Sequence, residues 1–226
     1  MSRGESPAVA ACVEAVEGLF GGLGRRLSAS AESAARAFDE TPVVTSERVM
    51  EIARPLAEEL LADDDLIGAG LVMTPGRVAD ELHLLAWWQG EDRRPIVWPT
   101  PLERSADYSR QEWFRTPMQT GSAHVTGPYI DYVCTDEFVL TTTVPVRGAS
   151  AGLIGVMGAD VLAETLERLL SDVFRKAGAT LVNHHDRAVL SGDPRTFAGD
   201  PIDRSEFPVV VPCTGFPLTV LARQPD

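Results

Sequence analysis

The sequence has few cysteines, and their spacing is not that of a metal site or a redox pair. Cys12, Cys134 and Cys213 are odd in number, and no two of them form a CxxC motif. This pattern argues against a disulfide scaffold and predicts reduced, mostly buried thiols.

Basic residues are scarce relative to acidic ones. The 20 Lys and Arg residues stand against 33 Asp and Glu residues, which gives a formal net charge of −13. A surface this acidic repels phosphate backbones, so the composition argues against nucleic-acid binding. It mildly favours cationic ligands.

Long hydrophobic runs are also missing. The longest glycine-rich apolar run, Ala151 to Ala159, is far shorter than the roughly 20 residues that a membrane-spanning helix needs. The N-terminal apolar stretch contains Glu5, Glu14 and Glu17, which a secretory signal would not tolerate. We therefore predict a cytoplasmic protein with no membrane segment.

The apolar residues of positions 1–62 predict two helices. Near the N-terminus they recur at steps of three and four, which places one apolar stripe on a long helix. A second helix is predicted from Ser46 to Ala62. Because an exposed apolar stripe is a liability, residues 1–62 are expected to pack on a sheet and to form a homodimer. The predicted dimer contacts are Val9, Val16, Phe20 and Leu23.

Residues 63–226 predict one ligand-binding domain with an antiparallel sheet. Alternating, β-branched segments between turn residues predict strands, and amphipathic segments predict two more helices. The expected fold class is α/β (α+β), with a long N-terminal helix followed by an antiparallel sheet on which helices pack. The predicted strands cover residues 66–74, 81–88, 138–146, 153–159, 179–183, 187–190, 209–211 and 218–222, and the helices cover 110–119 and 161–176.

One segment has the residue spacing of a serine-hydrolase motif. Gly148 to Gly152 matches G-x-S-x-G, and Asp160 and His184 follow Ser150 in the chain order of an α/β-hydrolase triad. That motif requires a strand, a sharp turn and then a helix, whereas the residues after Gly152 predict a strand. A hairpin loop is therefore favoured over a nucleophile.

Adjacent histidines give a weak metal signal. His184, His185 and Asp186 follow one another without a helical i, i+4 pair or a distant CxxC partner. Adjacent side chains in an extended chain point in opposite directions, so a polar turn is favoured. We expect neither a metal nor a cofactor.

Asp160 has two candidate roles. It follows a predicted strand and precedes a predicted helix, so it can cap the helix that begins at Val161. Gly155 and Gly158 lie just before it and leave room for another group to approach the sheet. The residues alone leave open whether Asp160 is only a cap or also contacts a ligand.

Aromatic residues are concentrated in the middle of the chain, among acids and prolines. This mixture suits a pocket for an organic cation or an amino-acid ammonium group. Aromatic residues also build cores, so both interpretations stay open. The cluster comprises Trp87, Trp88, Trp98, Tyr108, Trp113, Phe114, Tyr129 and Tyr132.

Four segments in a fixed order carry a family resemblance. They are Tyr108 to Phe114 with its Trp-aromatic pair, Gly127 to Asp131 with the pattern PYxD, the strand end Thr141 to Val146, and Gly152 to Asp160 ending in G-x-D. Together they resemble the Cache family of PAS-like, PDC-type small-molecule sensor domains, in particular its soluble single-chain actinobacterial branch.

The resemblance implies a PAS-like antiparallel sheet with a ligand pocket on one face. In members that bind amino acids or amines, the position of Asp160 takes the ligand ammonium group, and those of Tyr129 and Asp131 assist. Trp113 and Phe114 would hold the ligand carboxylate or its apolar part. The predicted ligand-binding residues are Tyr108, Arg110, Trp113, Phe114, Tyr129, Asp131 and Asp160.

The sequence departs from the amino-acid-binding pattern at one position. The pattern places an arginine two residues before the tryptophan, where this chain has Gln111 with Arg110 beside it. A small amine or amino acid is the favoured ligand class, and a small organic acid held by Arg110 is the alternative.

The leading hypothesis is a sensor that performs no chemistry. The sequence shows no kinase, methyl-accepting coiled coil or basic recognition helix. We therefore expect the signal to pass to a separate output protein, such as a transcription regulator, or through a change in oligomeric state. The alternatives from other classes are a serine hydrolase and a dimerisation module with a collapsed pocket.

Overall fold

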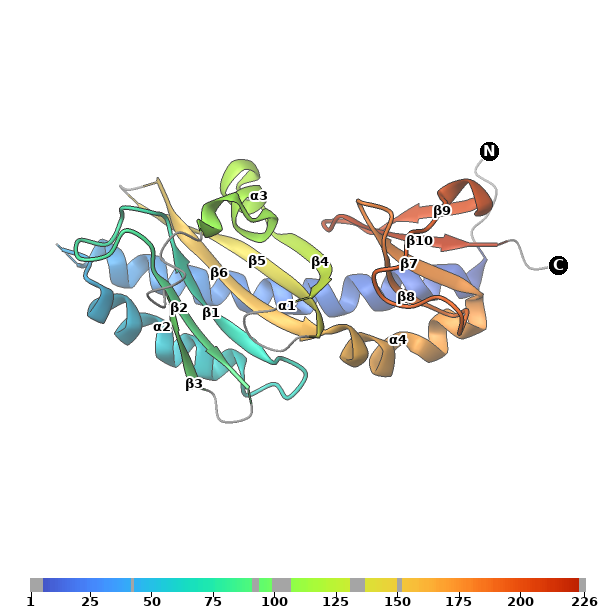
Figure 1. Ribbon diagram of the computed structural model, residues 1–226, viewed down its shortest axis with the longest axis horizontal. Helices are drawn as coiled ribbons and strands as arrows, with labels where there is room; N and C mark the ends of the chain where they lie inside the picture. Colours follow the sequence, from blue (N-terminus) through green and yellow to red (C-terminus); the bar gives the residue numbers. More distant parts are fainter. Residues whose placement is uncertain are drawn as a thin grey trace. The chain divides into compact units, whose positions relative to one another are not determined.

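The computed structural model describes residues 6–41, 43–90, 94–98, 107–130, 137–149 and 152–223 (Figure 1). The chain divides into two compact units. Unit 1 comprises Met1–Gly22, Val125–Leu140 and Val161–Asp226, and unit 2 comprises Leu23–His124 and Thr141–Asp160. The predicted division after residue 62 stays a prediction. Asp131, Tyr132, Cys134 and Ser150 lie outside the described residues, as does the side chain of Trp98.

Both predicted N-terminal helices are present. Helix α1 spans Pro7–Asp39, and helix α2 spans Ser46–Leu60. Thr45 caps α2, because its side chain accepts a hydrogen bond from the Arg48 N–H. The predicted start of α2 is therefore confirmed by its capping geometry.

The apolar stripe of α1 is buried within its own chain, which corrects the predicted dimer interface. Val9, Val16, Phe20 and Leu23 are at most 6% exposed. Side chains that already pack inside the protein cannot also form the contacts of a dimer. A homodimer stays a prediction, but these four residues do not provide its interface.

Helix α1 also corrects the expectation that no segment could cross a membrane. By length and composition alone, Pro7–Asp39 is long and apolar enough to span a bilayer. That expectation was based on uninterrupted apolar runs, whereas an 18-residue part of α1 is apolar enough on average although it is not uninterrupted. A core helix of a soluble protein meets the same criterion, so the cytoplasmic location stays a prediction.

The larger sheet confirms the predicted fold class. Its strand order is β3-β2-β1-β6-β5-β4, and the pairs β1–β2, β1–β6 and β2–β3 are antiparallel. Helix α2 packs against β1 and β2 (Figure 1). The strands are β1 (Gly68–Met73), β2 (Leu85–Gln89), β3 (Arg94–Trp98), β4 (His124–Ile130), β5 (Phe138–Gly148) and β6 (Gly152–Leu162).

Strands β3 and β4 were not predicted. The sequence around Pro95 is typical of a proline-rich connection, yet β3 is an edge strand, where proline need not interrupt the sheet. In β4, Gly127 and Pro128 are typical of a turn. Gly127 has φ 119°, and an added Cβ would lie 2.5 Å from the Val139 carbonyl oxygen, so only glycine fits there.

A second, smaller sheet lies within unit 1, where a single sheet was expected. Its strand order is β8-β7-β10-β9, and each strand matches a predicted one to within a few residues. Helix α4 (Ala163–Ala177) packs against β7 and β8. The strands are β7 (Ala179–Asn183), β8 (Ala188–Ser191), β9 (Val209–Pro212) and β10 (Leu218–Ala222).

The start of α4 corrects the capping role predicted for Asp160. Strand β6 continues through Leu162, and this leucine occupies the N-cap position without a side-chain capping bond. The backbone of Asp160 belongs to the sheet, because its carbonyl oxygen accepts a hydrogen bond from the Ile67 N–H at 3.0 Å. Asp160 is therefore a strand residue.

Two buried thiols in unit 1 give a prediction about pH. Burial raises the pKa of Cys12 to about 11, and burial followed by the charge of Glu17 raises the pKa of Cys213 to about 12, against about 8.5 for a free thiol. Because the thiolate is the reactive form, both should resist iodoacetamide at pH 8.5 until the protein is unfolded. Their contribution to stability should be full below about pH 8.5 and be lost as the pH approaches 11 to 12. Peptide mapping after alkylation tests this, and rapid labelling of the folded protein would contradict it.

Candidate functional site

Strand register in unit 2 places three positions in one row across the larger sheet. Gly68 on β1 pairs with Gln89 on β2 and with Asp160 on β6. Directly paired residues of antiparallel strands point to the same face. The side chains of Gln89 and Asp160 therefore flank Gly68, which has no side chain.

Two further rows follow along the same face. Residues two positions apart on a strand share a face, so the rows can be read directly from the register. Along this face, the first row is polar, the second consists of two glycines and a tryptophan, and the third is apolar. The second row consists of Gly158, Gly70 and Trp87, and the third of Val156, Val72 and Leu85.

The indole of Trp87 lies across these glycines. A Cβ added to Gly68 would come within 2.7 Å of the Trp87 Nε1, and one added to Gly158 would come within 3.4 Å of the Trp87 Cη2. The groups that approach the sheet at Gly158 are the Thr143 methyl group, 2.9 Å from the Cβ position, and the Trp87 indole, both from the same protein. A side chain at position 68 would displace the indole.

Asp160 provides a buried carboxylate at the polar end of the face. The residue is 4% exposed, and its Oδ1 accepts a hydrogen bond from the Thr141 Oγ1 at 2.6 Å. Its Oδ2 would lie 3.2 Å from a Cβ on Gly68, close to the same point as the Trp87 Nε1. The carboxylate and the indole N–H therefore converge on the space beside Gly68.

Two short helices cover the apolar end of the face. The 3-10 helix η1 spans Tyr108–Arg110, and α3 spans Glu112–Thr120. The buried rings of Tyr108 and Phe114 lie 5.3 Å apart between centroids. Trp113 is half-buried and packs against the same cluster. The buried members of this cluster are Val72, Trp87, Tyr108, Phe114 and Val156.

Two polar contacts fix α3 to the sheet. The Thr143 Oγ1 on β5 donates a hydrogen bond to the Trp113 carbonyl oxygen at 2.7 Å. The His124 Nε2 at the start of β4 lies 2.7 Å from the Glu112 Oε1. These contacts hold the Trp113 backbone in a defined place beside the sheet.

Tyr108 holds η1 onto the end of β1. Its hydroxyl donates to the Met73 carbonyl at 2.6 Å and accepts from the Leu84 N–H at 3.0 Å, and burial raises its pKa to about 12. We predict that Tyr108→Phe destabilises the fold by about 1–3 kcal/mol, because the Leu84 N–H loses its acceptor. Urea unfolding measures this, and an unchanged midpoint would show that the hydroxyl contributes nothing.

The remaining predicted site residues do not all lie on this face. The Arg110 side chain is 87% exposed, and its Nε lies 3.4 Å from the Asp107 carboxylate. Tyr129 is half-buried on β4 and belongs to unit 1. Asp131 lies outside the described residues. The predicted residues that share the unit 2 face are Tyr108, Trp113, Phe114 and Asp160.

Sequence reasoning missed three polar residues near this face. Gln89 shares a row with Asp160, Thr141 binds the Asp160 carboxylate, and Thr143 binds the α3 backbone. The alternation of side chains along a strand would have shown which residues of that one strand share a face. The rows across the sheet form because β1 pairs with both β2 and β6. No short segment of the sequence indicates this pairing.

The geometry does not support the serine-hydrolase alternative. Strand β5 ends at Gly148, and β6 begins at Gly152, so the G-x-S-x-G motif joins two strands. A nucleophile elbow needs a helix after the serine. Ser150 itself lies outside the described residues, and His184 lies in the turn after β7 within unit 1.

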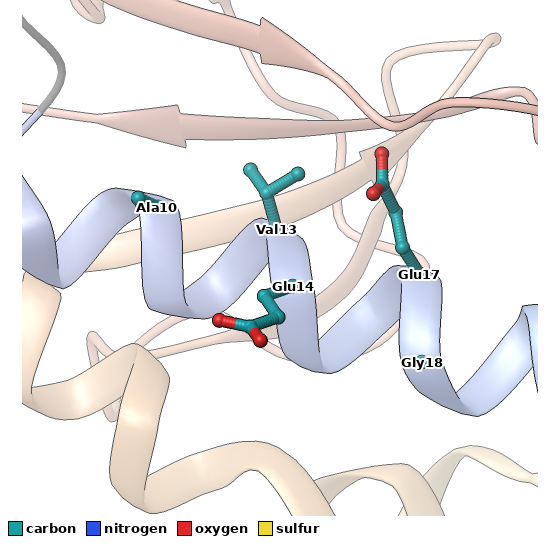
Figure 2. A pocket seen from close by; sticks show the side chains of 5 residues that line it. All are labelled: Ala10, Val13, Glu14, Glu17 and Gly18. Atoms are coloured by element: carbon teal, nitrogen blue, oxygen red, sulfur yellow. The ribbon is translucent and has the colours of Figure 1, made fainter.

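A shallow hollow beside α1 is a second candidate within unit 1 (Figure 2). The Glu17 Oε1 there already accepts a hydrogen bond from the Thr214 N–H at 2.5 Å. All of its lining side chains come from one helix, so it lacks the converging polar groups of a small-molecule site. The lining residues are Ala10, Val13, Glu14, Glu17 and Gly18.

Solved structures of sensor domains share the fold. Methyl-accepting chemotaxis protein X has a TM-score of 0.70 and 15% identity, with 97% of this chain and 95% of that chain covered. The ligand-binding domain of the Pseudomonas aeruginosa PAO1 amino acid chemoreceptor PctB in complex with L-Arg has a TM-score of 0.66 and 17% identity, covering 96% and 85%. The sensory domain of the Campylobacter jejuni chemoreceptor Tlp3 with isoleucine bound has a TM-score of 0.61 and 14% identity, covering 84% and 72%.

One curated protein shows a short similarity. The citrate (Re)-synthase of Syntrophus aciditrophicus (strain SB) is 37% identical over 60 residues. The match covers 26% of this chain and only 9% of that enzyme. So small a share of the enzyme carries no activity to this chain.

The family comparison covers just over half of the chain. Residues 52–168 match the family described as methyl-accepting chemotaxis protein-like, first PDC sensor domain. The matched segment contains the whole larger sheet together with η1 and α3, which are the elements that build the candidate face. The Cache-type resemblance is thereby confirmed, and the chain belongs to the methyl-accepting chemotaxis protein-like family of first PDC sensor domains.

Proposed function

We propose that this sensor domain binds a small cationic metabolite, an amine or an amino acid, on the unit 2 face beside α3, and performs no chemistry on it. The observation that carries the proposal is the buried carboxylate of Asp160 at the end of a face built from glycine and aromatic residues. An ammonium group there gains a charge-assisted hydrogen bond, and aromatic faces favour cations.

The position of Arg110 favours an amine over an organic acid. A carboxylate clamp needs a cation that faces the ligand, whereas the Arg110 guanidinium is largely exposed and lies beside Asp107. Gln111, which replaces the arginine of the amino-acid-binding pattern, is exposed at the N-terminus of α3. An organic acid remains the alternative ligand class.

The bound molecules of two similar structures support the same ligand class. L-Arg in the PctB domain and isoleucine in the Tlp3 domain are both amino acids and carry an ammonium group. Their identities of 17% and 14% support a class of ligand for this chain and no particular ligand. The assisting roles predicted for Tyr129 and Asp131 from the family resemblance stay predictions.

Output would follow from ligand binding through a separate protein or a change in oligomeric state. The similar solved structures include the ligand-binding domain of an amino acid chemoreceptor, which supports a role in sensing. A transcription regulator is one candidate output protein, and a cytoplasmic location suits that candidate. Light scattering with and without the bound amine tests whether binding changes the oligomeric state.

A thermal-shift screen against amines, amino acids and organic acids tests the proposed function. A ligand at 100 times its Kd stabilises a fold by about 2.7 kcal/mol, which raises the unfolding temperature measurably. We expect the stabilising compounds to carry an ammonium group. Stabilisation by organic acids alone would favour the alternative, and no stabilisation by any class would favour a dimerisation module.

A further inference from the structure

The polar row of the face holds a second buried polar group besides Asp160. The Oε1 and Nε2 of Gln89 are both buried, and neither has a hydrogen-bond partner among the residues that the structure describes. Buried amide groups in folded proteins are nearly always paired, because an unpaired donor or acceptor is costly. The partner of the Gln89 amide is therefore not among the described residues, and a bound ligand can supply it.

The position of Gln89 places that partner beside Asp160. Both residues pair with Gly68, one from β2 and the other from β6, so two strand spacings separate them. That corresponds to about 10 Å between their Cα atoms. Gly68 contributes no side chain, and the Trp87 Nε1 is the polar atom nearest to its Cβ position. The Trp87 indole therefore lies over the position between the two side chains, and a compact ligand whose polar groups are a few carbons apart would pack against this indole to reach both.

The chemistry of the Gln89 amide selects the second polar group of the ligand. The amide offers one acceptor oxygen and two N–H donors, and it carries no charge. A ligand carboxylate supplies only acceptors, so the buried Oε1 would stay unpaired. A primary amide supplies both a carbonyl oxygen and N–H groups, so it can pair with both atoms of Gln89.

We propose that Gln89 is a specificity-determining residue, and that the favoured ligand is a small amine whose other end is an amide. The proposal rests on the proposed function, since Asp160 is required to hold the ammonium group. It narrows the ligand class, because a zwitterion that ends in a carboxylate would satisfy Asp160 but only half of Gln89.

Calorimetry with three matched probes tests the proposal. β-Alaninamide, β-alanine and propylamine share an ammonium group and end in an amide, a carboxylate and a methyl group. The wild type should bind β-alaninamide at least about tenfold more tightly than the other two. Gln89→Met, with an apolar side chain of similar length, should abolish this preference while propylamine affinity stays within about threefold.

A second measurement needs no ligand. Because the Gln89 amide is buried and unpaired, Gln89→Met should leave the unfolding midpoint of the ligand-free protein unchanged or raise it. A lowered midpoint would show that the amide has partners in the free protein and would overturn the proposal.

The variants separate failure of this proposal from failure of the proposed function. If the wild type binds all three probes equally and Asp160→Asn abolishes binding of all of them, the proposed function stands and the role of Gln89 is wrong. If the wild type binds none of the three, the role of Gln89 is wrong, and the thermal-shift screen against amines, amino acids and organic acids decides the proposed function separately. A preference for β-alaninamide that survives in Gln89→Met also overturns the role of Gln89.

Discussion

Asp160→Asn is expected to keep the fold and to weaken binding of the amine found in the screen by about 30-fold or more. The substitution removes the negative charge but keeps an oxygen that can accept the hydrogen bond of the Thr141 hydroxyl. Loss of one partner of a largely desolvated charge pair costs about 2–5 kcal/mol, and 2 kcal/mol corresponds to about 30-fold. Isothermal titration calorimetry measures the affinity, and circular dichroism checks the fold.

Two further variants test whether the loss of affinity is specific to the Asp160 carboxylate. Asp172→Asn removes a carboxylate that is 83% exposed on α4, and it should change neither affinity nor stability. Asp160→Ala should lose affinity and also about 1–3 kcal/mol of stability, because the buried Thr141 hydroxyl loses this acceptor. Wild-type affinity in Asp160→Asn would remove Asp160 from the ligand site and favour an organic acid.

Val16→Glu is expected to abolish folding or to lower the free energy of unfolding by more than about 4 kcal/mol. Val16 is fully buried on α1, so a carboxylate there would be removed from water. Domains of this size are stable by only about 5–15 kcal/mol, so the loss approaches the whole margin. Urea unfolding followed by circular dichroism measures it.

Ala11→Glu is the matched control on the same helix. Ala11 is exposed, so the same new charge should change stability by only about 0.5 kcal/mol. A folded, monomeric Val16→Glu protein with native stability would contradict the burial of the α1 stripe. It would also restore the predicted dimer interface.

Local pattern was sufficient to predict most of the elements. The periodicity of α2 and α4 and the alternation of β5, β7 and β10 are properties of short segments, and these elements lie where they were expected. The boundary at Asp160 was not predictable in this way. An acid before an apolar, amphipathic run is typical of a cap, but the hydrogen bond from Ile67 extends the strand past it. That bond joins segments far apart in the sequence.

The candidate site was likewise predictable only in part. The resemblance to the Cache family implied that Trp113, Phe114 and Asp160 would share a site. The place of Trp87 over the glycines, and of Gln89 in the same row as Asp160, follows from the pairing of β1 with β2 and β6. Register decides which face each strand residue takes, and a shift of one residue would reverse it. No local feature of the sequence specifies that register.

A crystal structure of the protein with its bound amine tests the central claim most directly. The account predicts that the ammonium nitrogen lies about 2.7–2.9 Å from an Asp160 carboxylate oxygen, on the face that carries Trp87 and Gly68. An amine bound elsewhere, with the Asp160 carboxylate contacting only groups of the protein, would contradict it.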